Sequence, residues 1–327
     1  MGEQLKVSYG GAVGHALDRA LAEWPETILY GEDLAVPGGV FGVTRGLRAT
    51  YGERVFDTPI SETAMLGAAV GAAMMGRRPI VEIMWIDFAL VAFDQIVNQA
   101  ANVRYVSEGR LQAPLTIRTQ QGTAAGACAQ HSQNLEALLL HVPGIRVAMP
   151  TLPQDAHDIL LSAIACDDPV VVIENRSLYA GAKAEIVVGD DPAPIGGHRL
   201  RRAGEDVTVV TWGSMTRSVE AAVDEVAAEG MTADVIEAVW LDPFDTEAVL
   251  ASVERTGRLL VCHEANQTGG FGAEVVARVC ESGVPLRTPP RRVATQDLRI
   301  PAAVALAEVA LPQVADVTAA LRQLVGR

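Results

Sequence analysis

The 327-residue sequence has fewer basic than acidic side chains, 26 against 40, which gives a formal net charge of −14. Nucleic acids and anionic membranes both attract a basic surface, so this balance argues against either as a partner. No charge-free apolar run reaches the roughly 18 residues that a membrane-spanning helix needs. Residues 1–7 include polar and charged side chains and have no apolar core, unlike a secretory signal. We therefore expect a protein of the cytoplasm.

Motifs with paired cysteines or a phosphate-binding lysine are also missing. The four cysteines lie far apart without CxxC spacing, at Cys128, Cys166, Cys262 and Cys280. This pattern predicts reduced thiols and no zinc site. A glycine-rich loop spans residues 37–42, but no lysine follows it in the order GxxxxGK[ST]. We interpret it as an ordinary loop and not as a P-loop.

Apolar strand-like runs alternate with helical patterns along the whole chain. This alternation predicts parallel α/β sheets with helices on both faces. A stretch rich in proline, glycine and acidic residues interrupts it near residue 190 and predicts a linker. We expect one α/β domain over residues 1–189, a linker over 190–202 and a second α/β domain over 203–327. Within the first domain, apolar residues at helical spacing predict a single helix over residues 88–103.

One acid stands at the junction of a predicted strand and a predicted helix. Residues 55–58 read as a strand that Pro59 ends, because proline has no N–H for a ladder. Ser61 is placed to cap the next helix and Glu62 lies in its first turn. Gly67 and Gly71 share one face of that helix and permit close approach of another backbone. Ligands of parallel sheets bind at carboxyl strand ends, so Glu62 is either a dipole-complementing acid or a site residue.

Several motifs, in order along nearly the whole chain, resemble the β subunits of the thiamine-dependent 2-oxo acid dehydrogenases, the decarboxylating components of pyruvate, branched-chain and acetoin dehydrogenase complexes. The stretches that carry the resemblance are Gly31-Glu32-Asp33, Gly38-Gly39-Val40-Phe41-Gly42-Val43-Thr44-Arg45-Gly46-Leu47, Asp57-Thr58-Pro59-Ile60-Ser61-Glu62, Glu82-Ile83-Met84-Trp85-Ile86-Asp87-Phe88, Gln130-His131-Ser132-Gln133 and His263-Glu264-Ala265. The resemblance implies a transketolase-like chain with an N-terminal domain of the thiamine pyrimidine-binding type and a C-terminal domain of the transketolase type.

The resemblance also implies roles for individual residues. Glu62 would hydrogen-bond the pyrimidine ring of thiamine diphosphate and favour the imino tautomer that removes the C2 proton. Glu32 would be a second acid near the cofactor, and Phe88 would stack on the ring unless it is only a core residue. His131 would face the substrate, since histidine titrates near neutral pH and suits proton transfer. His263 is interpreted as a packing or interface residue.

Thiamine enzymes hold magnesium and the diphosphate through a Gly-Asp-Gly motif, which this sequence lacks. The resemblance therefore implies half of an active site, completed by an α subunit in an α2β2 heterotetramer. Members of the family also hold a structural potassium ion on backbone carbonyls. The matching positions here are Leu115, Ala163, Cys166 and Asp168.

The implied reaction is decarboxylation of a 2-oxo acid followed by reductive acylation of a lipoyl carrier, with a lipoyl acyltransferase core as a further partner. Two alternatives remain: half of a split transketolase-type enzyme that needs no lipoamide, and a non-catalytic assembly subunit. The substrate is open between acetoin, pyruvate and branched 2-oxo acids. The segment after Val293 departs from the family pattern, so the mode of docking to the core is open as well.

Overall fold

The computed structural model describes residues 3–326, which form two compact units. The first domain contains the residues up to 121 and residues 138–195, and the second contains residues 122–137 and those from 196 onward. The predicted linker is only partly irregular, because Arg199–Arg202 form strand β9 of the second domain.

The first domain is built on a parallel sheet whose strands run in the order β6-β7-β5-β4-β2-β3. These strands are β2 (Thr27–Gly31), β3 (Val55–Asp57), β4 (Arg78–Ile83), β5 (Thr116–Gln121), β6 (Arg146–Ala148) and β7 (Val170–Asn175). Most of their side chains are buried, as expected for a parallel sheet covered on both faces. A separate antiparallel pair joins β1 (Glu3–Val7) to β8 (Ala184–Val188).

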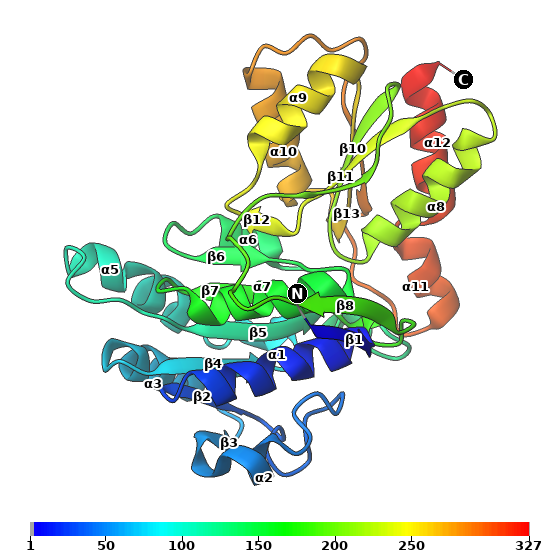
Figure 1. Cartoon of the computed structure of the whole chain (residues 1–327). Helices are drawn as coiled ribbons and strands as arrows, with labels where there is room; N and C mark the ends of the chain where they lie inside the picture. The colour runs from blue at the N-terminus through cyan, green and yellow to red at the C-terminus, as the bar shows by residue number, and fades with distance from the viewer. Residues whose placement is uncertain (1–2, 327) are drawn as a thin grey trace. The chain divides into compact units, whose positions relative to one another are not determined.

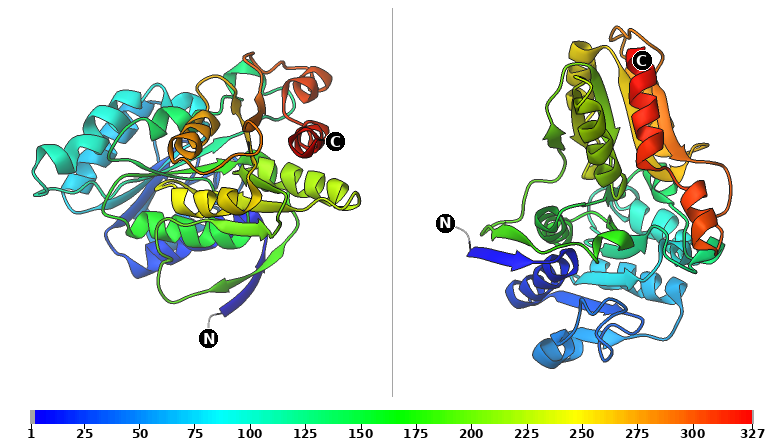
Figure 2. Two further views of the ribbon diagram at one scale, coloured as in Figure 1. Left: turned by 90° about the horizontal axis from the view of Figure 1, so that it is seen from above. Right: turned by 90° about the vertical axis from the view of Figure 1, so that its right-hand side faces the viewer.

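Helices cover both faces of this sheet (Figure 2). On one face α1 (Tyr9–Glu23) packs against α7 (Pro153–Ala165), and on the other α3 (Glu62–Met74) packs against β4. The Ser8 hydroxyl accepts the Gly11 N–H and caps α1. The shorter helices of this region are α2 (Leu47–Tyr51), α4 (Ile86–Ala89), α5 (Val103–Val106) and α6 (Glu136–Leu140).

The prediction of one helix over residues 88–103 was wrong. After α4 the chain forms a π-helical turn over Gln95–Gln99 and a 3₁₀ turn over Ala100–Asn102 before α5 begins. A π turn adds a residue to the helix, so the residues that follow rotate to a different face. The buried residues here include Ala92, Ile96 and Ala100, whereas Leu90, which precedes the π turn, is 42% exposed.

The second domain has a five-stranded sheet in the order β14-β13-β10-β11-β9, parallel except for β9. Its elements are β9 (Arg199–Arg202), β10 (Val207–Thr211), α8 (Met215–Ala227), β11 (Ala233–Glu237), β12 (Trp240–Asp242), α9 (Thr246–Thr256), β13 (Leu259–Asn266), α10 (Phe271–Glu281), β14 (Arg291–Thr295), α11 (Val304–Ala310) and α12 (Val314–Val325). Helices α8 and α12 lie on one side of this sheet and α9 and α10 on the other (Figure 1).

By length and composition alone, residues 304–325 pass as a helix apolar enough to cross a membrane. The structure divides them into α11 and α12, and Pro312 stands in the break between the two helices. The apolar side of α12 packs into the core of the second domain through Val317, Leu321 and Leu324. The apolar composition of α12 is therefore used in that core.

Candidate active site

Three predicted site residues of the first domain follow three neighbouring strands. β4, β2 and β3 are adjacent and parallel, and Gly31 at the end of β2 pairs with both Glu82 and Asp57. Glu32 is the next residue after β2, Glu62 begins the helix after β3, and Phe88 lies in the helix after β4. The sheet thus brings all three to its carboxyl edge, where ligands of parallel sheets bind.

Glu62 carries a largely buried carboxylate. The residue is 8% exposed, and nothing in residues 3–326 donates a hydrogen bond to it. Ser61 occupies the N-cap position of α3, but its hydroxyl makes no capping bond. The α3 N-terminus favours negative charge at this point. A buried carboxylate that accepts no hydrogen bond from the protein can accept one from the N–H of a ligand, such as that of the pyrimidine ring of thiamine.

Glu32 is held on a short loop by the carboxylate at the end of β3. Asp57 accepts the backbone N–H groups of Ala35 at 2.6 Å and Val36 at 3.1 Å. The Thr58 N–H also donates to the Gly31 carbonyl, at 2.9 Å. Burial raises the pKa of Glu32, and the negative charge of Glu62 raises it further. The two acids therefore interact electrostatically across the edge of the sheet.

Phe88 is half-buried in the short helix α4, just after the other residues of its sequence motif. Ile86 and Asp87 are buried, and Trp85 packs face-on against the guanidinium of Arg176, whose central carbon lies 3.2 Å from the ring centroid. The Thr63 hydroxyl donates to the Val91 carbonyl at 2.7 Å, so the start of α3 is tied to the chain after α4.

A buried ion network spans the three strands next to this edge. The Arg118 guanidinium on β5 is fully buried and lies between Glu82 on β4, at 2.5 Å, and Glu174 on β7, at 2.9 Å. The Tyr179 hydroxyl donates to Glu174. Burial raises the pKa of Glu82, although the positive charge of Arg118 opposes that rise. Such a network holds strands in one register as long as all its members are present.

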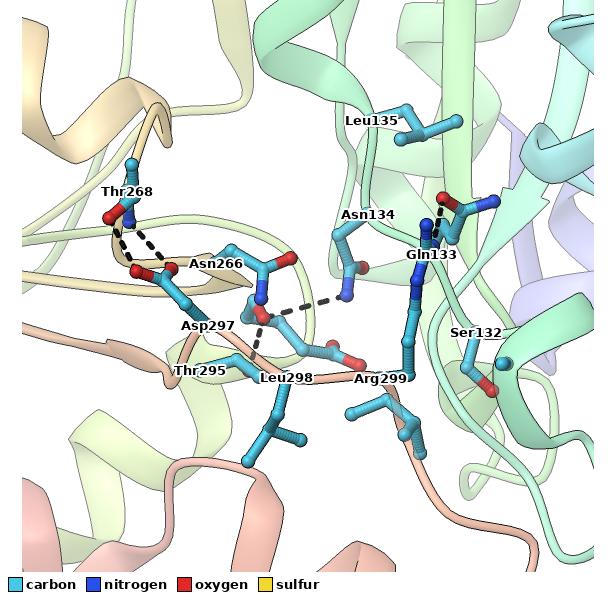
Figure 3. Close-up of a pocket in the computed structure, with 13 residues that line it drawn as sticks. Ser132, Gln133, Asn134, Leu135, Asn266, Thr268, Thr295, Asp297, Leu298 and Arg299 are labelled. Atoms are coloured by element: carbon cyan, nitrogen blue, oxygen red, sulfur yellow. Dashed lines mark hydrogen bonds between the residues drawn. The ribbon is translucent and has the colours of Figure 1, made fainter.

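His131 belongs to a different part of the molecule from the two acids. It lies half-buried in the segment Gly122–Ala137, which follows β5 in sequence but is part of the second domain. Cys128 just before it has a left-handed φ of 45°, and the hydroxyls of Thr123 and Ser132 lie 3.1 Å apart. The segment lines a cavity of about 580 Å³ in the second domain, together with residues such as Asn266, Asp297 and Arg299 (Figure 3).

The carbonyls predicted to hold potassium are mostly engaged by N–H donors. Leu115 O accepts from Val170 N at 2.9 Å, and Ala163 O from Cys166 N at 3.2 Å. The Arg78 guanidinium donates to Cys166 O at 3.0 Å. A guanidinium bonded to one of the four oxygens repels a second cation there. The Arg78 guanidinium therefore argues against a cation on the Cys166 carbonyl, and the potassium assignment stays a prediction.

The structure also assigns supporting roles that were not predicted from the sequence. Asp57 orients the Glu32 loop, and an acid that directly ends a strand is a signal that points to such a role. His263 is fully buried, and its ring stacks on Trp212 with centroids 5.1 Å apart. Burial lowers the pKa of His263 to about 4, helped by the positive charge of Arg292. The packing interpretation of His263 agrees with this position.

Comparison with known proteins places the chain in a family. Residues 6–181 match the transketolase pyrimidine binding domain and residues 196–317 match the transketolase C-terminal domain. The chain is 38% identical to the β subunit of acetoin:2,6-dichlorophenolindophenol oxidoreductase from Cupriavidus necator, over 97% of each chain. It is 39% identical to the β subunit of the pyruvate dehydrogenase E1 component from Acholeplasma laidlawii, over 89% of this chain and 90% of that one.

A solved structure titled as a split-gene transketolase in an inactive β4 tetramer has a TM-score of 0.78 and 25% identity, over 98% of each chain. The predicted two-domain transketolase-like α/β fold is therefore confirmed. The chain belongs to the transketolase-like β subunits of the thiamine-dependent 2-oxo acid and acetoin dehydrogenases.

Proposed function

We propose that this chain is the β subunit of an enzyme that decarboxylates a 2-oxo acid, or cleaves acetoin, and passes the acyl group to a lipoyl carrier. The observation that carries the proposal is Glu62, a buried carboxylate at the carboxyl edge of a parallel sheet to which no described residue donates a hydrogen bond. Thiamine diphosphate, when bound, supplies the reactive carbon and the electron sink for such chemistry. In this proposal the enzyme acts in the cytoplasm, where its four free cysteines stay reduced.

Three residues of the first domain would hold the pyrimidine half of the cofactor. Glu62 accepts the N–H of the ring nitrogen, and Phe88 offers a half-buried aromatic face for stacking. Glu32 adds a second acid, whose pKa is raised by burial and by the negative charge of Glu62. In the second domain, His131 would hold or transfer a proton on the substrate.

The diphosphate and magnesium half of the site would come from an α subunit in an α2β2 heterotetramer. This chain has no Gly-Asp-Gly motif to hold them. One face of α3 is also suited to a partner, because small residues at positions 64, 68 and 71 are exposed there and a Cβ added at Gly71 would meet nothing within 4 Å. The solved split-gene transketolase chain is titled inactive as a β4 tetramer. A site that needs two kinds of subunit accounts for all three observations.

Sequence identity to the relatives does not select one substrate. The acetoin and pyruvate relatives differ by a single percentage point of identity to this chain, so identity does not separate them. The split transketolase is less similar, at 25%, which favours acyl transfer to a lipoyl acyltransferase core over C–C bond transfer. We therefore keep acetoin, pyruvate and branched 2-oxo acids as the substrate class.

Calorimetry on the chain alone and with its α subunit tests the split site. We expect thiamine diphosphate with magnesium to bind in the micromolar range only when both subunits are present. Dye reduction by the assembled enzyme with acetoin, pyruvate and branched 2-oxo acids then identifies the substrate. Micromolar binding by the isolated chain would contradict the shared site, and no dye reduction with any of them would contradict the reaction.

A further inference from the structure

The segment that carries His131 is bound by a side chain from the far end of the second domain. Arg299 lies between β14 and α11, and its Nη1 donates to Gln133 Oε1 at 2.7 Å (Figure 3). Gln133 is two residues after His131, so this bond fixes the backbone next to the histidine. Hydrogen bonds from a charged donor are roughly twice as strong as neutral ones.

Arg299 is itself carried by a loop that several hydrogen bonds attach to the rest of the second domain. The Thr268 backbone N–H donates to Asp297 at 3.1 Å and its hydroxyl donates to the same carboxylate at 2.5 Å. Asn266 at the end of β13 donates to the Gln296 carbonyl at 2.8 Å. These bonds, drawn in part in Figure 3, attach the loop to the end of a buried strand. Arg299 thus approaches Gln133 from a fixed support.

Two more contacts hold the segment on its C-terminal side. The indole N–H of Trp212 donates to Glu136 Oε1 at 3.1 Å, and both side chains are at most 2% exposed. Asn134 Nδ2 points to the Glu264 carbonyl at 3.5 Å. The buried pair fixes the end of the segment, whereas the exposed Arg299–Gln133 bond lies two residues from His131.

We propose that Arg299 is a positioning residue for His131, acting through its hydrogen bond to Gln133. The C-terminal domain then does more than support the fold, because it holds the segment that bears the substrate-facing histidine. This role for His131 rests on the function proposed above, whereas the restraint on the segment does not. The two parts are therefore tested separately.

Hydrogen–deuterium exchange on the full chain, without partner or cofactor, tests the restraint. Arg299→Ala should speed amide exchange over residues 130–136 by about 10-fold, the factor expected for losing a charged hydrogen bond. Arg291→Ala is the matched control, since Arg291 is an exposed arginine on β14 with no contact to the segment. Unchanged exchange over residues 130–136 in Arg299→Ala would overturn the proposal.

A double-mutant cycle tests the route through Gln133. In a Gln133→Leu background, Arg299→Ala should cause little further increase in exchange, because the shared bond is already lost. Arg299→Lys should recover part of the protection, since lysine keeps the charge and a donor. An equal effect of Arg299→Ala in both backgrounds would show that the segment is held in another way, and would contradict the proposal.

The assembled enzyme tests the consequence for catalysis. Arg299→Ala should slow the substrate step of a single turnover by about 10-fold, the loss expected when an acid–base group is misplaced, and leave C2 proton exchange of the cofactor unchanged. Arg299→Lys should restore part of that rate. If C2 exchange falls equally, Arg299 does not act through His131. If the wild type decarboxylates nothing, the proposed function fails while the exchange result still decides the restraint.

Discussion

The edge that bears the two acids and the segment that bears His131 are built in different ways. Glu32 and Glu62 follow the ends of adjacent parallel strands, so the backbone of the sheet brings them together, and the Asp57 carboxylate holds the loop after Glu32. His131 lies in a segment held by side chains, through the Arg299–Gln133 and Trp212–Glu136 bonds. The acids are therefore part of the fold itself, whereas the position of the histidine depends on individual contacts that single substitutions remove.

Removing the carboxylate at the edge should have the largest effect on activity. Glu62→Gln keeps the shape of the side chain but not the charge that favours the reactive tautomer. We expect turnover to fall at least ~100-fold, the scale of a positioned acid–base group, with assembly intact. Steady-state dye reduction measures it, with Glu53→Gln as a control at an exposed acid. Near-normal turnover in an assembled Glu62→Gln enzyme would rule out the role.

Breaking the ion network next to the edge should reduce stability. Arg118→Met leaves Glu82 and Glu174 buried without their shared cation. Removing one partner of a buried ion pair typically reduces the free energy of unfolding by about 3–5 kcal/mol. Urea unfolding compares this variant with Arg77→Met, which changes an exposed arginine. If Arg118→Met lowers the free energy of unfolding no more than Arg77→Met does, the network does not stabilise the sheet.

The second domain, in which His263 stacks on Trp212 and Trp212 donates to Glu136, should lose stability in acid. The folded-state pKa of His263 is about 4, below the ordinary 6.5, so its stabilising effect is complete above pH 6.5. Stability is then lost as the pH falls from 6.5 toward 4, by up to about 3 kcal/mol. Urea midpoints between pH 7.5 and 4.5 should show a smaller slope in His263→Gln than in wild type. His141→Gln, at an exposed histidine, should keep the wild-type slope.

The same contrast explains what the sequence predicts and what it does not. Glu32, Glu62 and Phe88 follow short apolar strands, and a strand end is a local signal. The alternation of strands and helices likewise predicts the two-domain α/β fold. The bond between Arg299 and Gln133 joins residues 166 positions apart, and no local pattern indicates a contact of that kind. The π turn after α4 was missed because the apolar residues of 88–103 keep helical spacing across it.

The acids at the sheet edge and the segment that carries His131 are expected to serve different steps. The most direct test compares the rates of those two steps in one enzyme. C2 hydrogen–deuterium exchange of bound thiamine diphosphate reports cofactor activation, and single-turnover decarboxylation reports the substrate step. We predict that His131→Ala slows the substrate step by about 100-fold or more while C2 exchange stays near wild type. Glu62→Gln should slow both. An equal fall of both rates in His131→Ala, or no fall in either, would contradict the account.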